Sequence, residues 1–158
     1  MRELPHTHSC FVCGESNPFG LRMRFETDGR IVQARFTLRP EHIGFRGTIH
    51  GGITATILDE IMVWACAVQT GRFAVCAELN VRYLSPIRPG DAVVATGELA
   101  VNRRNKLFEA RAELRLQSNA ETVLAGATGK YFPIKEADAA ELARDFVGEP
   151  LMNFGGAA

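Results

Sequence analysis

The sequence has no surplus of charge of one sign: its 158 residues include 18 Lys and Arg against 18 Asp and Glu, a formal net charge of zero. General binding to nucleic acid or to an anionic membrane surface requires a basic surplus, so neither partner is expected. A long hydrophobic run is also missing. The longest, IMVWACAV at 61–68, is far shorter than the roughly 20 residues that a membrane span requires.

The first ten residues, MRELPHTHSC, lack the apolar stretch of a secretion signal. With four cysteines and no export signal, the expected location is the cytoplasm, where thiols stay reduced. The remaining composition, 46% hydrophobic and 23% charged, is typical of a soluble globular protein with a sizeable core.

Hydrophobic periodicity divides the chain into three parts. Residues 1–29 are expected to form an irregular lead-in that contains the CxxCG motif at 10–14. Residues 30–134 are expected to form a single domain, and residues 135–158 a short helix and a tail. Alternation predicts strands at 30–38, 74–84, 91–101, 106–117 and 122–133, and the apolar segment 51–69 predicts a helix that Gly71 ends.

The strand at 106–117 has one charged face, with Glu109, Arg111, Glu113 and Arg115, and one apolar face. A sheet of this kind needs its apolar face covered, and the helix at 51–69 is the only candidate. The sequence therefore predicts an α+β fold in which a curved antiparallel sheet wraps a long central helix. A single copy leaves sheet edges poorly protected, so at least a symmetric dimer is expected.

Two adjacent carboxylates, Asp59 and Glu60, lie in the middle of this apolar helix. At 3.6 residues per turn they point about 100° apart, so they cannot share one task on one face. A buried carboxylate is costly unless it is paired or hydrogen-bonded, so each acid needs a partner. Two interpretations remain open: pairing at a subunit interface, or catalysis.

The helix begins at His50-Gly51-Gly52, where backbone N–H groups have no intrahelical partner. These groups suit the negative oxygen formed in acyl transfer, although a glycine pair also makes a tight entry turn. His50 and Asp59 are nine positions apart, about 13 Å along a helix, so they cannot form a hydrogen-bonded pair within one chain. If they cooperate, they do so across a two-fold axis.

Three segments together resemble the hotdog-fold acyl-CoA thioesterases of the phenylacetate-pathway (PaaI) type: HIGFRGTIHGGITATILDE at 42–60, ELNVRYLSPIRPGD at 78–91, and the lead-in CFVCGESNPFGLRMRF at 10–25. The resemblance covers roughly residues 10–133. It implies a hotdog fold, a homodimer that assembles further into a dimer of dimers, and hydrolysis of the thioester of a small or medium acyl-CoA.

The resemblance also implies roles for single residues. Asp59 falls on the acidic position that acts as general base or nucleophile, and Gly51 on the position whose N–H polarises the thioester carbonyl, with His50 beside it. Cys76 lies where some relatives have a Ser or Thr that orients water. Gly52, Cys76 and Phe45 are the expected substrate-binding residues, Phe45 as part of an acyl pocket.

Two other functions use the same fold. A non-catalytic acyl-CoA-binding or sensing protein would keep Gly51 but would not need Asp59. A hydratase of this fold typically has its Asp ahead of a His near the helix start, whereas here the acid follows the His inside the helix. The thioesterase is the favoured interpretation.

The lead-in HTHSCFVCG raises the question of a metal. His6, His8, Cys10 and Cys13 contain half of a zinc motif, but no second pair follows at zinc-finger spacing. The favoured interpretation is a packed segment with reduced thiols and no metal or other cofactor; zinc held by these four residues is the alternative.

Overall fold

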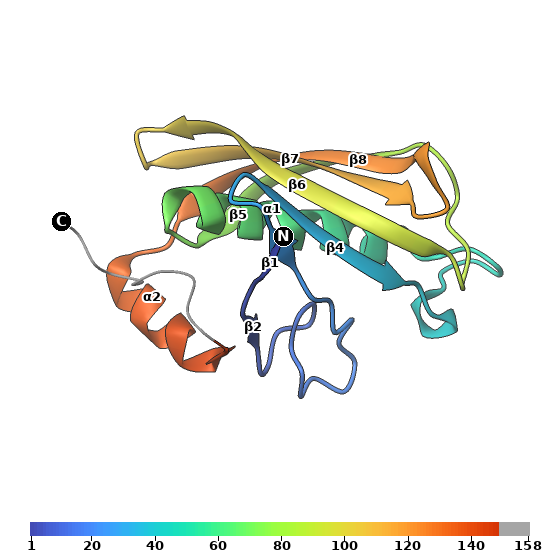
Figure 1. Ribbon diagram of the computed structural model, residues 1–158, viewed down its shortest axis with the longest axis horizontal. Helices are drawn as coiled ribbons and strands as arrows, with labels where there is room; N and C mark the ends of the chain where they lie inside the picture. The colour runs from blue at the N-terminus through green and yellow to red at the C-terminus, as the bar shows by residue number, and fades with distance from the viewer. Residues whose placement is uncertain (149–158) are drawn as a thin grey trace.

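The computed structural model describes residues 1–148; residues 149–158 of the predicted tail lie outside that range. One long helix, α1 (Gly51–Thr70), lies against a seven-stranded antiparallel sheet that curves over it (Figure 1). The order in the sheet is β1-β3-β4-β6-β7-β8-β5. The strands are β1 (Arg2–Glu3), β3 (Glu26–Thr27), β4 (Ile31–Thr37), β5 (Ala74–Tyr83), β6 (Ala92–Arg103), β7 (Leu107–Leu116) and β8 (Asn119–Pro133). The predicted α+β architecture of a helix wrapped by a sheet is confirmed.

Helix α1 begins at the predicted residue and ends one residue later than predicted. The imidazole of His50 caps its start by accepting a hydrogen bond from Gly52 N–H at 2.8 Å, and Gly71 ends it in the left-handed conformation at φ 72°. The helix is long and apolar enough to cross a bilayer by length and composition, yet half of that segment is buried inside the fold. This burial fits the central helix of a folded domain.

The predicted charged face of the sheet is also present. Ala112 and Leu114 of β7 are buried, whereas the alternating Arg111 and Glu113 are exposed. On this outer face Arg111 bonds Glu98 of β6 at 2.6 Å, and similar pairs join other neighbouring strands. Since period-two alternation places side chains on opposite faces, the apolar half of each strand packs towards α1.

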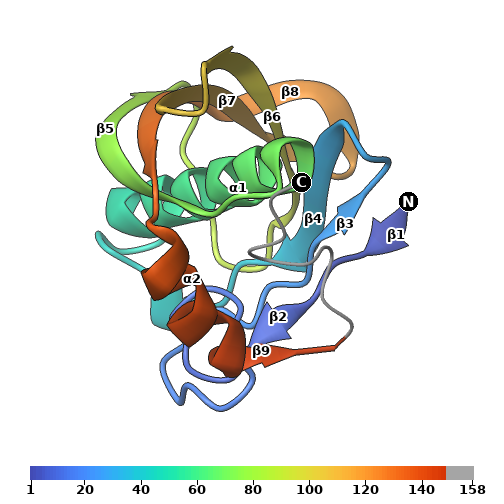
Figure 2. The same cartoon turned by 90° about the vertical axis from the view of Figure 1, so that its left-hand side faces the viewer.

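The lead-in and the C-terminal segment together cover the side of α1 that the sheet leaves open (Figure 2). The lead-in, expected to be irregular, contributes β1 and β3 to the main sheet and pairs β2 (His6–Thr7) with β9 (Phe146–Val147). Ser9 Oγ donates to Asp145 Oδ2 at 2.7 Å. The C-terminal segment comprises α2 (Glu136–Leu142), a 3₁₀ turn η2 (Ala143–Asp145) and β9; a second 3₁₀ turn, η1 (Pro40–His42), follows β4.

An aromatic cluster joins these covering segments to α1. Trp64 lies at the centre, 1% exposed, with ring centroids 5.6 Å from Phe25, 5.2 Å from Phe73 and 5.9 Å from Phe146. The contacts with Phe73 and Phe146 are edge-on, and such contacts add to the energy of area burial. The side of α1 that carries Trp64 is therefore closed by residues from both ends of the chain.

Candidate active site

Asp59 points from the middle of α1 towards β8 and β5. The hydroxyl of Tyr131 on β8 donates a hydrogen bond to Asp59 Oδ1 at 2.9 Å. Cys76 on β5 is the cross-strand partner of Tyr131, and its thiol also lies beside the carboxylate. Burial, with Asp59 as the second cause, raises the pKa of the Cys76 thiol to about 11, so the thiol stays protonated at neutral pH.

Tyr131 is completely buried, and its orientation depends on Gly129. A Cβ at position 129 would lie 2.6 Å from the Tyr131 hydroxyl, so only glycine lets the ring lie over the strand and reach α1. Burial raises the pKa of the Tyr131 phenol, and the Asp59 carboxylate raises it further. The phenol therefore remains a neutral hydrogen-bond donor that orients Asp59.

The start of α1 offers one unpaired backbone donor. Gly52 N–H is taken by the His50 imidazole, whereas Gly51 N–H makes no hydrogen bond within residues 1–148. The exposed Tyr83 of β5 donates to Gly51 O at 2.9 Å and so holds the first turn of the helix. Of the two predicted glycines, Gly51 is thus the one whose N–H is free to donate a hydrogen bond to a ligand oxygen. His50 instead caps the start of the helix.

Asp59 and Gly51 are eight positions apart, about 12 Å along one helix, too far to act on one carbonyl. Both face β5, which is the last strand of the sheet and pairs only with β8 in the described part of the chain. Most of β5 is exposed, including Val75 at 57% and Tyr83 at 55%. An unpaired edge with apolar side chains is a place for another strand to add.

Glu60 points the other way, towards the lead-in. Its Oε1 accepts hydrogen bonds from Trp64 Nε1 at 3.1 Å and from the Cys10 thiol at 3.8 Å. Burial raises the pKa of the Glu60 carboxyl to about 8. The hydrogen bond between the two thiols lowers the pKa of Cys10 and raises that of Cys13.

The other predicted residues lie apart from these two clusters. Phe45 is 90% exposed on the loop before α1, with no cover from the rest of the described chain over most of its side chain. His6 and His8, which the alternative zinc site would have combined with the two cysteines, both contact the Glu15 carboxylate, at 3.1 and 2.9 Å. A hollow of about 700 Å³ lies on the outer face of the sheet, between residues such as Arg82, Arg111 and Thr128, and does not reach Asp59.

Sequence reasoning missed Tyr131 and the contacts of Glu60 with the lead-in. Tyr131 lies 72 positions after Asp59, and Cys10 lies 50 positions before Glu60, so no local pattern links them. The only signal for Tyr131 was a large aromatic residue in an otherwise small-residue stretch, GATGKYF at 126–132.

The sequence profile of the thioesterase superfamily matches residues 46–123, which run from the loop before α1 into β8. Human acyl-coenzyme A thioesterase 13 is 30% identical over 81 residues, 51% of this chain and 57% of its own length, so the chain spans little more than half of that relative.

Two solved structures share the fold. PaaI of the Escherichia coli phenylacetic acid degradation operon has 21% identity and a TM-score of 0.64, over 72% of this chain and 80% of its own. A Streptococcus mutans protein solved bound to acetyl CoA has 20% identity and a TM-score of 0.64, over 71% and 88%. Over residues 46–123 the chain is similar to the thioesterase superfamily, and the protein has the hotdog fold.

Proposed function

We propose that the protein is an acyl-CoA thioesterase in which Asp59 of one subunit acts together with Gly51 N–H of another. The observation that carries this proposal is a carboxylate in the middle of an apolar helix, held by the Tyr131 hydroxyl at 2.9 Å beside an unpaired sheet edge. A carboxylate in that setting can accept the proton of an attacking water or attack the thioester itself.

Besides this carboxylate, hydrolysis of a thioester needs a hydrogen-bond donor to the carbonyl oxygen. Gly51 N–H, strengthened by the positive end of the α1 dipole, donates to the thioester oxygen and stabilises the negative charge that develops there. Water adds to the carbonyl carbon as Asp59 takes its proton. The tetrahedral intermediate then collapses, the bond to sulfur breaks, and the leaving coenzyme A thiolate takes that proton back from Asp59 to leave as its thiol. Gly52 N–H donates to the His50 imidazole, so Gly52 contributes only indirectly, by holding the start of α1 in place.

A dimer across the β5 edges supports the sharing of the site. Adding β5 of a second copy would extend the sheet and cover Val75 and Tyr83, which are exposed in one chain. The helix start of each copy would then approach the middle of the other helix. Two side chains are available to contact an acyl group there. Phe45 is 90% exposed beside the helix start, and Cys76 lies beside Asp59.

The comparisons support acyl-CoA as the substrate class. The human relative carries acyl-coenzyme A thioesterase in its name, and the Streptococcus mutans neighbour holds acetyl CoA. The 46–123 match to the thioesterase superfamily includes α1, which contributes Gly51 and Asp59. The proposal also includes a small or medium acyl group, a homodimer that pairs into a dimer of dimers, a cytoplasmic location, and a hydrolysis step that uses no cofactor.

The test is steady-state hydrolysis of acyl-CoAs from acetyl to palmitoyl, with phenylacetyl-CoA included, followed by the release of free thiol. Wild type is expected to turn over at least one of them. Asp59→Asn keeps the shape of the side chain but removes the base, so kcat should fall by about a hundredfold or more. Asp138→Asn, which changes an exposed aspartate on α2, is the matched control and should keep wild-type kcat.

An Asp59→Asn protein that is folded and oligomeric yet retains its kcat would overturn the role of Asp59. Binding of the acyl-CoAs without turnover by wild type would overturn the enzyme and favour an acyl-CoA-binding protein. Mass and radius from light scattering give the oligomeric state, and a monomeric active enzyme would overturn the shared site.

A further inference from the structure

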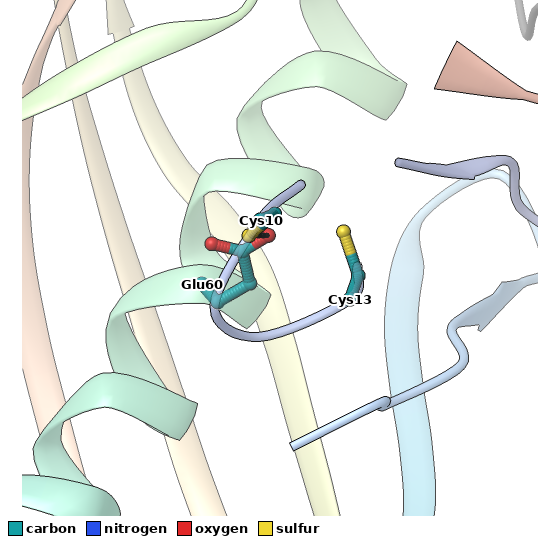
Figure 3. A group of neighbouring side chains, drawn as sticks. All are labelled: Cys10, Cys13 and Glu60. Atoms are coloured by element: carbon teal, nitrogen blue, oxygen red, sulfur yellow. Dashed lines mark hydrogen bonds between the residues drawn. The ribbon is translucent and has the colours of Figure 1, made fainter. Parts of the chain in front are cut away.

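Two cysteines of the lead-in and one carboxylate of α1 form a cluster that the proposed hydrolysis does not use. The sulfur atoms of Cys10 and Cys13 and a carboxylate oxygen of Glu60 all lie within 4.8 Å of one another. Figure 3 shows the two cysteines on one turn of the lead-in, facing the helix that carries Glu60. The residues come from positions 50 apart, and the fold alone brings them together.

We propose that Cys10, Cys13 and Glu60 bind one Zn²⁺ ion. A tetrahedral zinc has Zn–S and Zn–O bonds of about 2.3 and 2.1 Å, which place its ligand atoms about 3.5–3.8 Å apart. Cys10 Sγ and Glu60 Oε1 are 3.8 Å apart, so the ligands need only small movements to meet one ion. The inference is independent of the proposed hydrolysis, because neither the ligands nor the test involve Asp59.

The turn that carries the cysteines is already arranged for two sulfur ligands. Val12 N–H donates to Cys10 Sγ at 3.2 Å, and Thr7 Oγ1 lies 3.4 Å from Cys13 Sγ while accepting from Cys10 N–H at 3.1 Å. A Cβ at Gly14 would lie 2.3 Å from Cys10 O, so only glycine closes this turn after the second cysteine. Donors of this kind stabilise thiolates and fix the direction of a ligand.

The third ligand is also fixed by its surroundings. The indole of the buried Trp64, one helical turn after Glu60, donates to Oε1 at 3.1 Å and leaves Oε2 without a hydrogen bond in the described chain. Metal-ligating carboxylates typically have such a second partner. Two thiolates and one carboxylate are a donor set that zinc accepts, with the fourth position left to water or an added ligand.

Such an ion would join the lead-in to α1 at the residue next to Asp59. The two cysteines lie outside the 46–123 match to the thioesterase superfamily, whereas Glu60 lies inside it. His6 and His8 are not part of the proposed set, because both imidazoles contact Glu15.

The test uses the full chain, reduced, freed of metal by chelation, and titrated with Co²⁺ and then Zn²⁺. Wild type is expected to bind one Co²⁺ per chain with the intense sulfur-to-cobalt absorption of thiolate ligation, and Zn²⁺ should displace it. Zinc affinity is then measured by competition with a chromophoric chelator. Cys13→Ser should lower it by more than about a hundredfold, beyond the 10–100-fold typical of an outer partner.

Matched variants separate the three ligands from their neighbours. Cys76→Ser removes a thiol elsewhere and His8→Ala removes a nearby imidazole, and both should keep wild-type zinc affinity. Glu60→Gln keeps both thiols and should weaken zinc at least tenfold, which covers the case that Cys13→Ser fails to fold. The proposal is overturned by absent sulfur-to-cobalt absorption in wild type, by unchanged affinity in folded Cys13→Ser or Glu60→Gln, or by a loss in His8→Ala equal to that in Cys13→Ser.

Discussion

Asp59 and Glu60 are neighbours in sequence, yet they serve two different regions of the molecule. Asp59 meets a tyrosine hydroxyl and a thiol beside an open sheet edge, where a second chain and a substrate can approach. Glu60 meets two cysteines and an indole under the lead-in, in a setting closed by both ends of the chain. One side of α1 is open to other molecules, and the other is closed by the protein itself.

The difference shows how one helix can carry two sites without interference. A step of about 100° per residue sends adjacent side chains into separate surroundings, so the two acids experience different neighbours and burial. Burial raises the pKa of Glu60 to about 8, so its carboxyl is harder to ionise than an exposed one. Asp59 instead keeps a neutral donor, Tyr131, whose hydrogen bond orients it for reaction.

The largest effect is expected from Gly51→Pro, which removes the N–H that has no hydrogen-bond partner in residues 1–148. Proline is tolerated at the first helical position, and His50 already has the extended backbone, ψ 132°, that a following proline requires. The fold should therefore survive while kcat falls by about a hundredfold to a thousandfold. Zinc affinity, which depends on the other side of α1, should not change.

Mixing this variant with Asp59→Asn tests whether the site is shared. A dimer of one chain of each kind would contain one site with both Asp59 and Gly51 N–H intact. Co-expression should therefore restore up to about a quarter of wild-type activity if chains pair at random. No recovery in purified mixed dimers would contradict the assignment of Asp59 and Gly51 to different subunits.

Tyr131→Phe should have an intermediate effect. It removes the hydroxyl that positions Asp59 but keeps the buried ring, and a hydrogen bond to a charged group is worth about 1.5–3 kcal/mol. We expect kcat to fall by about tenfold or somewhat more with KM nearly unchanged, measured on the best acyl-CoA. A rise in KM at constant kcat would instead make Tyr131 a substrate-binding residue.

Trp64→Phe should have the smallest effect, and the property it changes is zinc affinity on the Glu60 side of α1. It removes the indole donor to Glu60 and keeps an aromatic ring in the cluster, so zinc affinity should weaken by about tenfold. Phe25→Leu disturbs the same cluster without touching Glu60 and serves as the control for general loosening. Equal zinc affinity in Trp64→Phe and wild type would show that the indole does not orient the carboxylate.

Much of the fold was predictable because it depends on local periodicity. The start of α1 at Gly51, its end near Gly71, and the alternation of Arg111 and Glu113 with buried Ala112 follow from residues within a few positions of one another. The two-residue strands of the lead-in were not predictable. They are too short to show a period, and each depends on a partner strand: β1 pairs with β3, β3 with β4, and β2 with β9 from the other end of the chain.

The sequence by itself determined that two acids of an apolar helix face different ways, and that its glycine start and its middle are too far apart to act within one chain. Both conclusions need only the pitch of a helix. Tertiary structure decided what each acid meets: Tyr131 of β8 for Asp59, and the Cys10–Cys13 turn for Glu60. Those contacts join residues 50 and 72 positions apart, and only the packing of the sheet and the lead-in around α1 sets them.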